Sequence, residues 1–254
     1  MITRTLTAAT LLAFASAFPG ASAGQPPLAL TASPSHLTLV GSSSATIRIV
    51  NQGASPLVVE AAPAGFTLGL RGGPRILLAG TAARRAASWL GLRPRLLVLA
   101  PGGGAELALV ATPRHGAAPG DYPAVVLITA RAARSDDVSV RMRIGITVVV
   151  RVSGRTRHRL VVQSVRLRRV GDRCVVTIDV RNGGNVVERL RRGAVSASLA
   201  ARGHVLAVLD SQPRELLPHT RAVVELPYRR RCTGRVAAVV TVFASSRRTF
   251  HLRL

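Results

Sequence analysis

Fifteen residues that decide the fold read VSVRMRIGITVVVRV, from Val138 to Val152. Apolar and polar side chains alternate through much of this run, and β-branched residues dominate it, which is typical of a strand in a half-buried sheet. The run is long for one strand, so we expect Gly145 to mark a bend or bulge where the chain changes neighbours.

Similar β-rich runs recur upstream and downstream at a spacing of about eight to twelve residues. Residues 45–50 and 105–111 alternate in the same way, and Gly, Pro, Ser and Asn separate the runs, as at Ser33-Pro34. The Gly-rich residues 65–85 are less regular and predict a long loop or a weak hairpin. No long window has apolar residues at helical spacing without an intervening Gly or Pro. The pattern therefore predicts an all-β chain of two tandem immunoglobulin-like β-sandwich domains.

The amino terminus has the order of a signal peptide. Arg4 precedes an apolar stretch at 6–18, and Ala21-Ser22-Ala23 forms a small-x-small cleavage site, so we expect a signal peptide at 1–23. The stretch is shorter than the ~20 residues of a membrane span, which leaves an uncleaved anchor as the alternative. The rest divides into a domain at 24–152, a linker at 153–156 and a domain at 157–254. We expect a secreted protein with no integral membrane span after cleavage.

All 35 basic residues are arginine, and the formal net charge is +24. A chain without lysine indicates codon bias, so charge alone is weak evidence for a ligand. The second half is the more basic, with 21 Arg against six acids after residue 152. Its arginines could form a basic face for an anionic polymer, or could simply be a solvated surface. The candidates are Arg166, Arg168, Arg169, Arg229, Arg230 and Arg231. Nucleic acid is not expected, because aromatic residues for base stacking are scarce.

Cys174 and Cys232 are the only cysteines, and both lie in the second domain. An even pair in an exported chain predicts a disulfide, with two free buried thiols as the alternative.

The residues that would carry chemistry do not converge. The six histidines are scattered, no cysteine has metal-ligand spacing, and no nucleophile elbow is present. Asp136 and Asp137 are adjacent but lie in an apparent turn, where aspartate is favoured for local hydrogen bonding. We therefore predict no enzymatic activity, no catalytic residue, no metal and no cofactor.

Trp89 is the only tryptophan, and Arg84 and Arg85 precede it. An exposed indole beside guanidinium groups can stack on a sugar or a peptide, so these three residues and Tyr122 are the candidate ligand-binding residues. The alternative is that Trp89 fills the core between the sheets.

Several short motifs of the first domain occur in a known order. They are Ser33-Pro34 with Leu37 and Leu39, residues 47–53, Ala87-Ser88-Trp89-Leu90, Leu99-Ala100-Pro101-Gly102, Pro119-Gly120-Asp121-Tyr122 and residues 143–146. Over about residues 28–152 this set resembles the peptidoglycan-binding domain of the WxL-interacting proteins of Gram-positive surfaces. The resemblance implies association with peptidoglycan and a protein partner at the surface. Members of that family usually end in a transmembrane helix, whereas this chain ends in a strand-like segment.

These observations lead to a non-catalytic, exported and cell-wall-associated binding or scaffold protein. Its first domain would bind peptidoglycan, and its second an anionic polymer or a surface protein. The alternative is a secreted, chaperone-like protein that binds an extended partner strand by β-strand addition. A module that targets a separate hydrolase is a third reading. The sequence does not predict an oligomeric state.

Overall fold

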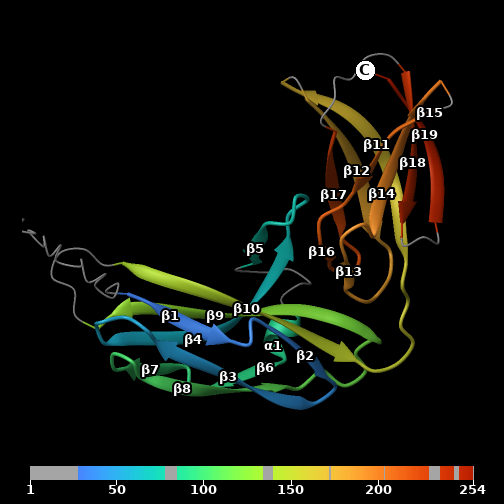
Figure 1. The fold of residues 1–254 in the computed structure, drawn as a ribbon. Coiled ribbons are helices and arrows are strands. Elements are labelled where there is room, and N and C mark those ends of the chain that lie inside the picture. The colour runs from blue at the N-terminus through green and yellow to red at the C-terminus, as the bar shows by residue number, and fades with distance from the viewer. Residues whose placement is uncertain are drawn as a thin grey trace, which may run out of the picture.

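The computed structural model describes residues 28–77, 85–133, 140–171, 173–202, 204–228, 235–242 and 246–253. Within these ranges the chain forms strands β1 to β19 and one short helix, α1 (Arg85–Ser88). They build two β-sandwiches joined at an angle (Figure 1). The predicted all-β fold with two tandem immunoglobulin-like domains is confirmed, while the predicted signal peptide at 1–23 lies outside the described residues.

The first sandwich packs a four-stranded sheet against a six-stranded sheet. The first sheet has the order β1 (Leu30–Ser33), β3 (Ser43–Asn51), β8 (Gly104–Ala111) and β6 (Leu90–Arg93). The second has the order β2 (His36–Val40), β10 (Arg141–Val152), β9 (Gly120–Ala132) and β4 (Leu57–Leu68), and both β5 (Pro74–Leu77) and β7 (Leu96–Leu99) pair with β4. Alternation places one face of each strand in the core, where Ile47, Leu107 and Ile128 have no exposed surface.

The chain changes sheets at the Ser33-Pro34 break. β1 pairs antiparallel with β3, whereas β2 pairs parallel with β10, from Thr147 to Arg151 of that strand. Proline has no N–H to donate, so it interrupts a ladder at such a point. Because β2 is short, it covers only the second half of β10.

The expected bulge at Gly145 is wrong. β10 pairs with β9 from Arg141 to Val152 without a register shift, and it gains its second neighbour at Thr147. Glycine fits closely here, because an added Cβ would lie 3.2 Å from Cγ2 of Val125 and would require that side chain to shift. The predicted change of neighbours is confirmed close to this position.

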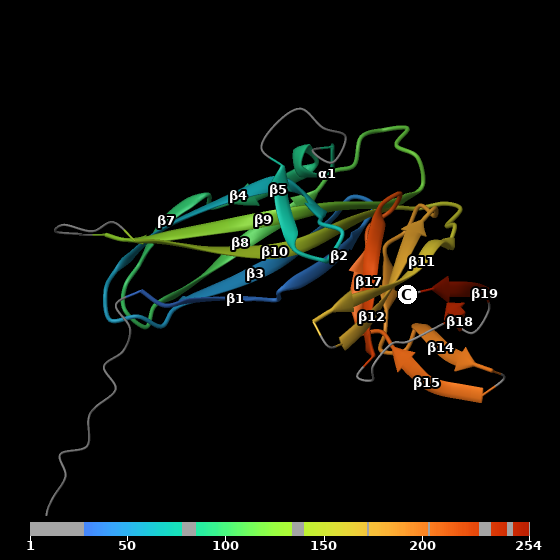
Figure 2. The same ribbon diagram turned by 90° about the horizontal axis from the view of Figure 1, so that it is seen from above.

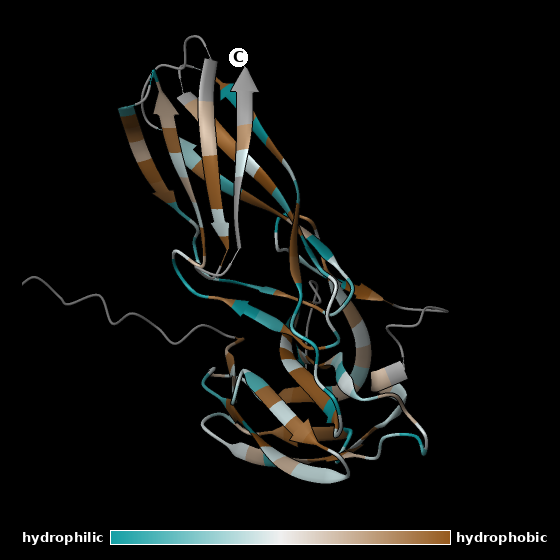
Figure 3. Ribbon diagram, turned by 90° about the vertical axis from the view of Figure 1, so that its right-hand side faces the viewer, coloured by the Kyte–Doolittle hydropathy of each residue, from teal (hydrophilic) through white to brown (hydrophobic). Residues whose placement is uncertain are grey.

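The second sandwich is built from three sheets. One has the order β11 (Leu160–Val170), β12 (Arg173–Asn182) and β17 (Arg221–Tyr228), and another pairs β13 (Glu188–Leu190) with β16 (Arg214–Leu216). The third has the order β15 (His204–Asp210), β14 (Val195–Ala201), β18 (Arg235–Val242) and β19 (Ser246–Arg253). Its core contains Val176, Ile178, Leu226 and Val240. Figure 3 shows apolar and polar bands alternating along strands of both sandwiches.

The two domains share a turn built on a buried asparagine. Asn51 ends β3 and donates to the carbonyls of Ser55, Leu99 and Ala100, while its side-chain oxygen accepts from Gly53 N–H. Asn182 ends β12 and repeats the pattern, with bonds to Val186 O, Leu216 O and Gly184 N–H. Neither asparagine has any exposed surface. Each amide therefore satisfies backbone groups that the strand end would leave unpaired.

Domain one contacts domain two through the hairpin of β4 and β5. Residues 65–77 of the region expected to be a loop or a weak hairpin form this hairpin, which rises from its sheet toward β16 and β17 (Figures 1 and 2), while residues 78–84 lie outside the described residues. Phe66 and Val125 of domain one are buried together with Leu217 of domain two. β10 ends at Val152 and β11 begins at Leu160, so the connection between the domains is short. No helix in the described ranges is long and apolar enough to cross a bilayer.

Candidate functional site

The first half of β10 is an open edge. Across the described ranges, Arg141–Ile146 pair with β9 on one side, and the pairing with β2 on the other side begins only at Thr147. An unpaired half-strand presents a row of backbone donors and acceptors that another extended chain can complete. At about 3.3 Å per residue, the open part is about 20 Å long.

The side chains along this edge alternate between two environments. Met142 and Ile144 are half-buried and pack against the core of domain one, while Arg141 and Arg143 point to the opposite face and are exposed. Ile146, at the end of the open part, is fully buried. The apolar side chains along this edge are thus fully buried at Ile146 and only half-buried at Met142 and Ile144.

The exposed face beside this edge is basic. Arg131 of β9 lies directly opposite Arg141, and Arg143 donates a 3.3 Å hydrogen bond from Nε to Oγ1 of Thr129. Glu60 of β4 pairs in register with Thr129 and is the carboxylate nearest to them in the ladder. The described residues contain no ion pair for Arg131, Arg141 or Arg143.

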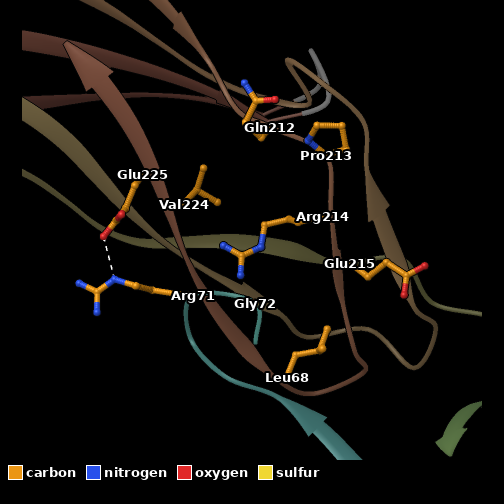
Figure 4. A pocket seen from close by; sticks show the side chains of 9 residues that line it. All are labelled: Leu68, Arg71, Gly72, Gln212, Pro213, Arg214, Glu215, Val224 and Glu225. Carbon is orange, nitrogen blue, oxygen red and sulfur yellow. Dashed lines mark hydrogen bonds and ion pairs between the residues drawn. The ribbon is translucent and has the colours of Figure 1, made fainter. Parts of the chain in front are cut away.

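A cleft of about 470 Å³ lies between the tip of the β4–β5 hairpin and domain two (Figure 4). Across it, Arg71 of the hairpin donates from Nε to Oε1 of Glu225 on β17, at 2.9 Å. Leu70 O accepts a 2.7 Å hydrogen bond from Val223 N–H, so the hairpin tip also bonds to the backbone of β17. The hairpin is therefore fastened to domain two at its tip.

Arg214 of β16 projects into this cleft (Figure 4). It donates to Val223 O and, at 3.2 Å, to Leu70 O, while its buried Nε has no partner among the described residues. Burial lowers the pKa of Arg214, and the nearby Glu225 carboxylate partly opposes that shift. The side chain thus joins the two domains through backbone carbonyls rather than through a carboxylate of its own.

A buried carboxylate of domain one, paired with Arg151, contacts domain two at the far end of β9 and β10. The Asp121 side chain, which is 0% exposed, accepts from Nε of Arg151 at 2.6 Å and from Nη2 at 2.8 Å. The same carboxylate accepts a 2.8 Å hydrogen bond from Val187 N–H of domain two. The bond to Asp121 raises the pKa of Arg151. Asn185 adds a 2.8 Å hydrogen bond to Pro119 O, so the junction is polar as well as apolar.

The first residue of β2, a histidine, lies at the domain junction. His36 contacts Arg189 of β13, and Nε of Arg189 also binds Glu215 at 3.0 Å. Burial, followed by the Arg189 charge, lowers the pKa of His36, and Glu215 partly offsets these effects. Nearby, Nδ1 of His158 lies 3.0 Å from Oε1 of Glu188.

The structure brings together two of the predicted ligand-binding residues. The rings of Trp89 and Tyr122 have centroids 4.7 Å apart and border a cavity of about 580 Å³ with Arg114 and His115. Trp89 is half-buried against the core, and the Tyr122 hydroxyl donates a 2.8 Å hydrogen bond to Ala118 O. Such a bond is typical of the tyrosine corner of immunoglobulin-like domains. Arg84 and the side chain of Arg85 lie outside the described residues.

The predicted basic face is described only in part. Arg166, Arg168 and Arg169 are exposed on β11, whereas residues 229–231, which hold the other three arginines, lie outside the described residues. Cys174 is buried, whereas Cys232 lies outside the described residues, so the disulfide between them stays a prediction. No group of three potential metal ligands occurs in the part of the chain that the structure describes.

Sequence reasoning missed the open edge of β10 as a site. The signal was present in Arg141-Met142-Arg143-Ile144, where large apolar residues alternate with arginine at the start of a long strand. Asp121 was noted only within the motif Pro119-Gly120-Asp121-Tyr122, and Arg71 and Arg214 were not singled out. Their importance depends on a contact between domains, which has no sequence pattern of its own.

Comparisons with known proteins give structural neighbours only. No protein-family model and no curated protein matches the chain. Solved structures that resemble it include the YadV chaperone, with 12% identity, a TM-score of 0.48, and coverage of 89% of this chain and 99% of that one. A Salmonella enterica structure, the SafA pilin with the SafB chaperone, has 13% identity, a TM-score of 0.48, and coverage of 89% and 97%. The Pseudomonas aeruginosa CupB2 chaperone has 14% identity, a TM-score of 0.44, and coverage of 88% and 100%. At these values the likeness carries no functional conclusion.

Proposed function

We propose that the chain is an exported, non-catalytic binding protein that holds an extended segment of a partner protein by β-strand addition at Arg141–Ile146. The observation that carries this proposal is the half-covered β10, whose backbone edge is open where Met142 and Ile144 are only half-buried. In β-strand addition, main-chain hydrogen bonds supply affinity, and contacts with alternate side chains supply specificity. Both elements are present in these six residues.

The rest of the fold supports the same role. β2 occupies the edge of β10 from Thr147 onward, so an added strand would have a defined end. The hairpin tip and the Asp121–Arg151 pair fix domain two beside the same sheet. A rigid scaffold lowers the entropy cost of ordering the binding surface.

The test uses the protein from residue 24 onward and an end-blocked eight-residue peptide of alternating valine and serine. Amide hydrogen exchange should slow at 141–146 when the peptide is added. The double variant Met142→Glu/Ile144→Glu should bind about thirtyfold more weakly or worse, because it loses the remaining burial of two large apolar side chains, about 1 kcal/mol each. Unchanged exchange at 141–146 at saturating peptide would refute the proposal.

The matched control is Leu96→Glu/Val98→Glu on β7. Like Met142 and Ile144, these residues are two positions apart on a strand at the edge of a sheet, and they are 66% and 65% exposed. The control should bind the peptide like the unmodified protein. Equal loss in both variants would assign the effect to a general loss of apolar surface.

A wall polymer is the second candidate ligand, through the cavity beside Trp89 and Tyr122. Two aromatic rings with Arg114 and His115 nearby suit a sugar with anionic groups. Co-sedimentation with purified peptidoglycan at low and high salt tests this role. Salt-resistant pelleting that Trp89→Ala abolishes would support it, and no pelleting would exclude it.

A further inference from the structure

We propose that the segment held at β10 carries acidic side chains at alternate positions, with apolar side chains between them. This inference rests on the proposed strand addition and names the class of partner sequence. It follows from the two faces of the open edge, which differ in both polarity and charge.

Geometry places two partner side chains next to two arginines. The side chains of a strand added to β10 would project to the same two faces of the sheet as the side chains of β10. Residues directly opposite each other in such a pair have Cβ atoms about 4.5–5.5 Å apart. Residues opposite Met142 and Ile144 would therefore face the core of domain one. Residues opposite Arg141 and Arg143 would lie on the exposed face, within reach of both guanidinium groups.

Among the described residues of β4, β9 and β10, arginines outnumber carboxylates on that face. Arg131 and Arg141 are direct cross-strand neighbours, and like charges at such positions are destabilising. Glu60 supplies one nearby negative charge against the three arginines Arg131, Arg141 and Arg143. An acidic partner residue would relieve this repulsion, whereas a basic one would increase it.

A second pair of facing arginines shows how the fold balances such charges elsewhere. Arg181 and Arg221 are cross-strand neighbours on β12 and β17, and Arg221 binds Asp179 through two hydrogen bonds. The arginines at the open edge have no described ion pair of this kind. With no such pair among the described residues, the proposal places the compensating carboxylates on the partner strand.

The position after Arg143 adds a steric feature. Gly145 is exposed and lies on the same face as Arg141 and Arg143, so the added strand meets no side chain there. Beyond Arg143, this face of the sheet becomes apolar, because Leu127 and Val125 of β9 lie opposite Gly145 and Thr147 of β10. The acidic preference is thus confined to the two partner positions beside Arg141 and Arg143.

The experiment compares three end-blocked eight-residue peptides with valine at alternate positions and Glu, Ser or Lys at the others. Affinity is measured by fluorescence anisotropy at low and high salt. Two opposite-charge pairs should make the Glu peptide bind about two- to thirtyfold more tightly than the Ser peptide, and the Lys peptide should bind weakest. The differences should shrink at high salt, because exposed charges are screened.

Two variants decide whether this edge is the source of the preference. Arg141→Glu/Arg143→Glu should reverse the order, so that the Lys peptide binds best. Arg166→Glu/Arg168→Glu makes the same charge change at the same spacing on the exposed face of β11 and should keep the original order. Circular dichroism of both variants shows whether they remain folded.

The outcomes separate this inference from the function on which it rests. Equal binding of all three peptides at low salt would overturn the acidic preference while leaving strand addition intact. Binding of none of them would overturn strand addition itself. An acidic preference that survives in Arg141→Glu/Arg143→Glu and disappears in Arg166→Glu/Arg168→Glu would place it in domain two and overturn the inference.

Discussion

Replacing Asp121 with alanine tests whether its buried carboxylate holds the two domains together. The substitution removes the acceptor of both hydrogen bonds from Arg151 and of the hydrogen bond from Val187 N–H. Removing one partner of a buried pair costs about 3–5 kcal/mol. The Arg151 side chain is 41% exposed, so water can solvate part of its charge, and we expect the lower end, about 3 kcal/mol.

Thermal unfolding and small-angle X-ray scattering measure the two consequences. In a chain of this size, 1 kcal/mol shifts Tm by about 2–4 °C, so Asp121→Ala should lower Tm by about 6–12 °C. The radius of gyration should rise under conditions where both domains remain folded, because Val187 no longer bonds to domain one. Asp121→Asn keeps the shape and removes the charge, so it should lose less stability than Asp121→Ala.

The control is Asp179→Ala, which breaks the bond of Asp179 to Arg221 within domain two. That aspartate is more exposed, at 15%, and its arginine is 56% exposed, so the loss should be below about 1 kcal/mol. It should leave the radius of gyration unchanged. Equal small losses in the two variants, with no change in scattering, would refute the role assigned to Asp121.

Three further results follow from other contacts. Asn51→Ala and Asn182→Ala should each cost about 2–4 kcal/mol in urea unfolding, because each removes three or four hydrogen bonds made by a fully buried amide; a loss below 1 kcal/mol would contradict this. Cys174→Ala/Cys232→Ala should cost about 4 kcal/mol, the value for a loop of about 60 residues, and reducing agent should then have no further effect. The lowered pKa of His36 means that the unfolded chain binds its proton at higher pH, so stability should fall as pH decreases below about 6.5 and level off below the lowered pKa. His36→Gln should flatten this slope, and an identical slope in both proteins would assign the pH dependence to other groups.

The sequence predicts the parts of this fold that depend on local patterns. Alternation located strands such as β3, β8 and β10, and Ser33-Pro34 located the break between β1 and β2, because period-two burial and the missing proline N–H act within a few residues. The change of sheet at this break was not predicted. α1 was not predicted, since a single helical turn between Arg85 and Ser88 has too few residues for a periodic signal.

The parts that could not be predicted depend on contacts between distant segments. The β4–β5 hairpin looks weak in sequence because its stabilising partner, β17, lies more than 140 residues away along the chain. The arginines raise the same difficulty, since a chain without lysine uses arginine at every basic position. Arg151, Arg221 and Arg143 differ only in the carboxylate or hydroxyl that the fold places beside each of them.

β10 carries the domain contact at one end and the open edge at the other. Its last residues carry Arg151, which pairs with the buried Asp121 at the contact with Val187 of domain two. Its first residues form the open edge, and the antiparallel ladder to β9 is continuous between the two ends. A partner strand added at Arg141–Ile146 would extend this ladder, and it could not continue past Thr147 because β2 already occupies that edge. Under the proposed strand addition, β2 would therefore fix one end of the bound segment at Thr147, and Arg141, Arg143 and the half-buried Met142 and Ile144 would select its side chains.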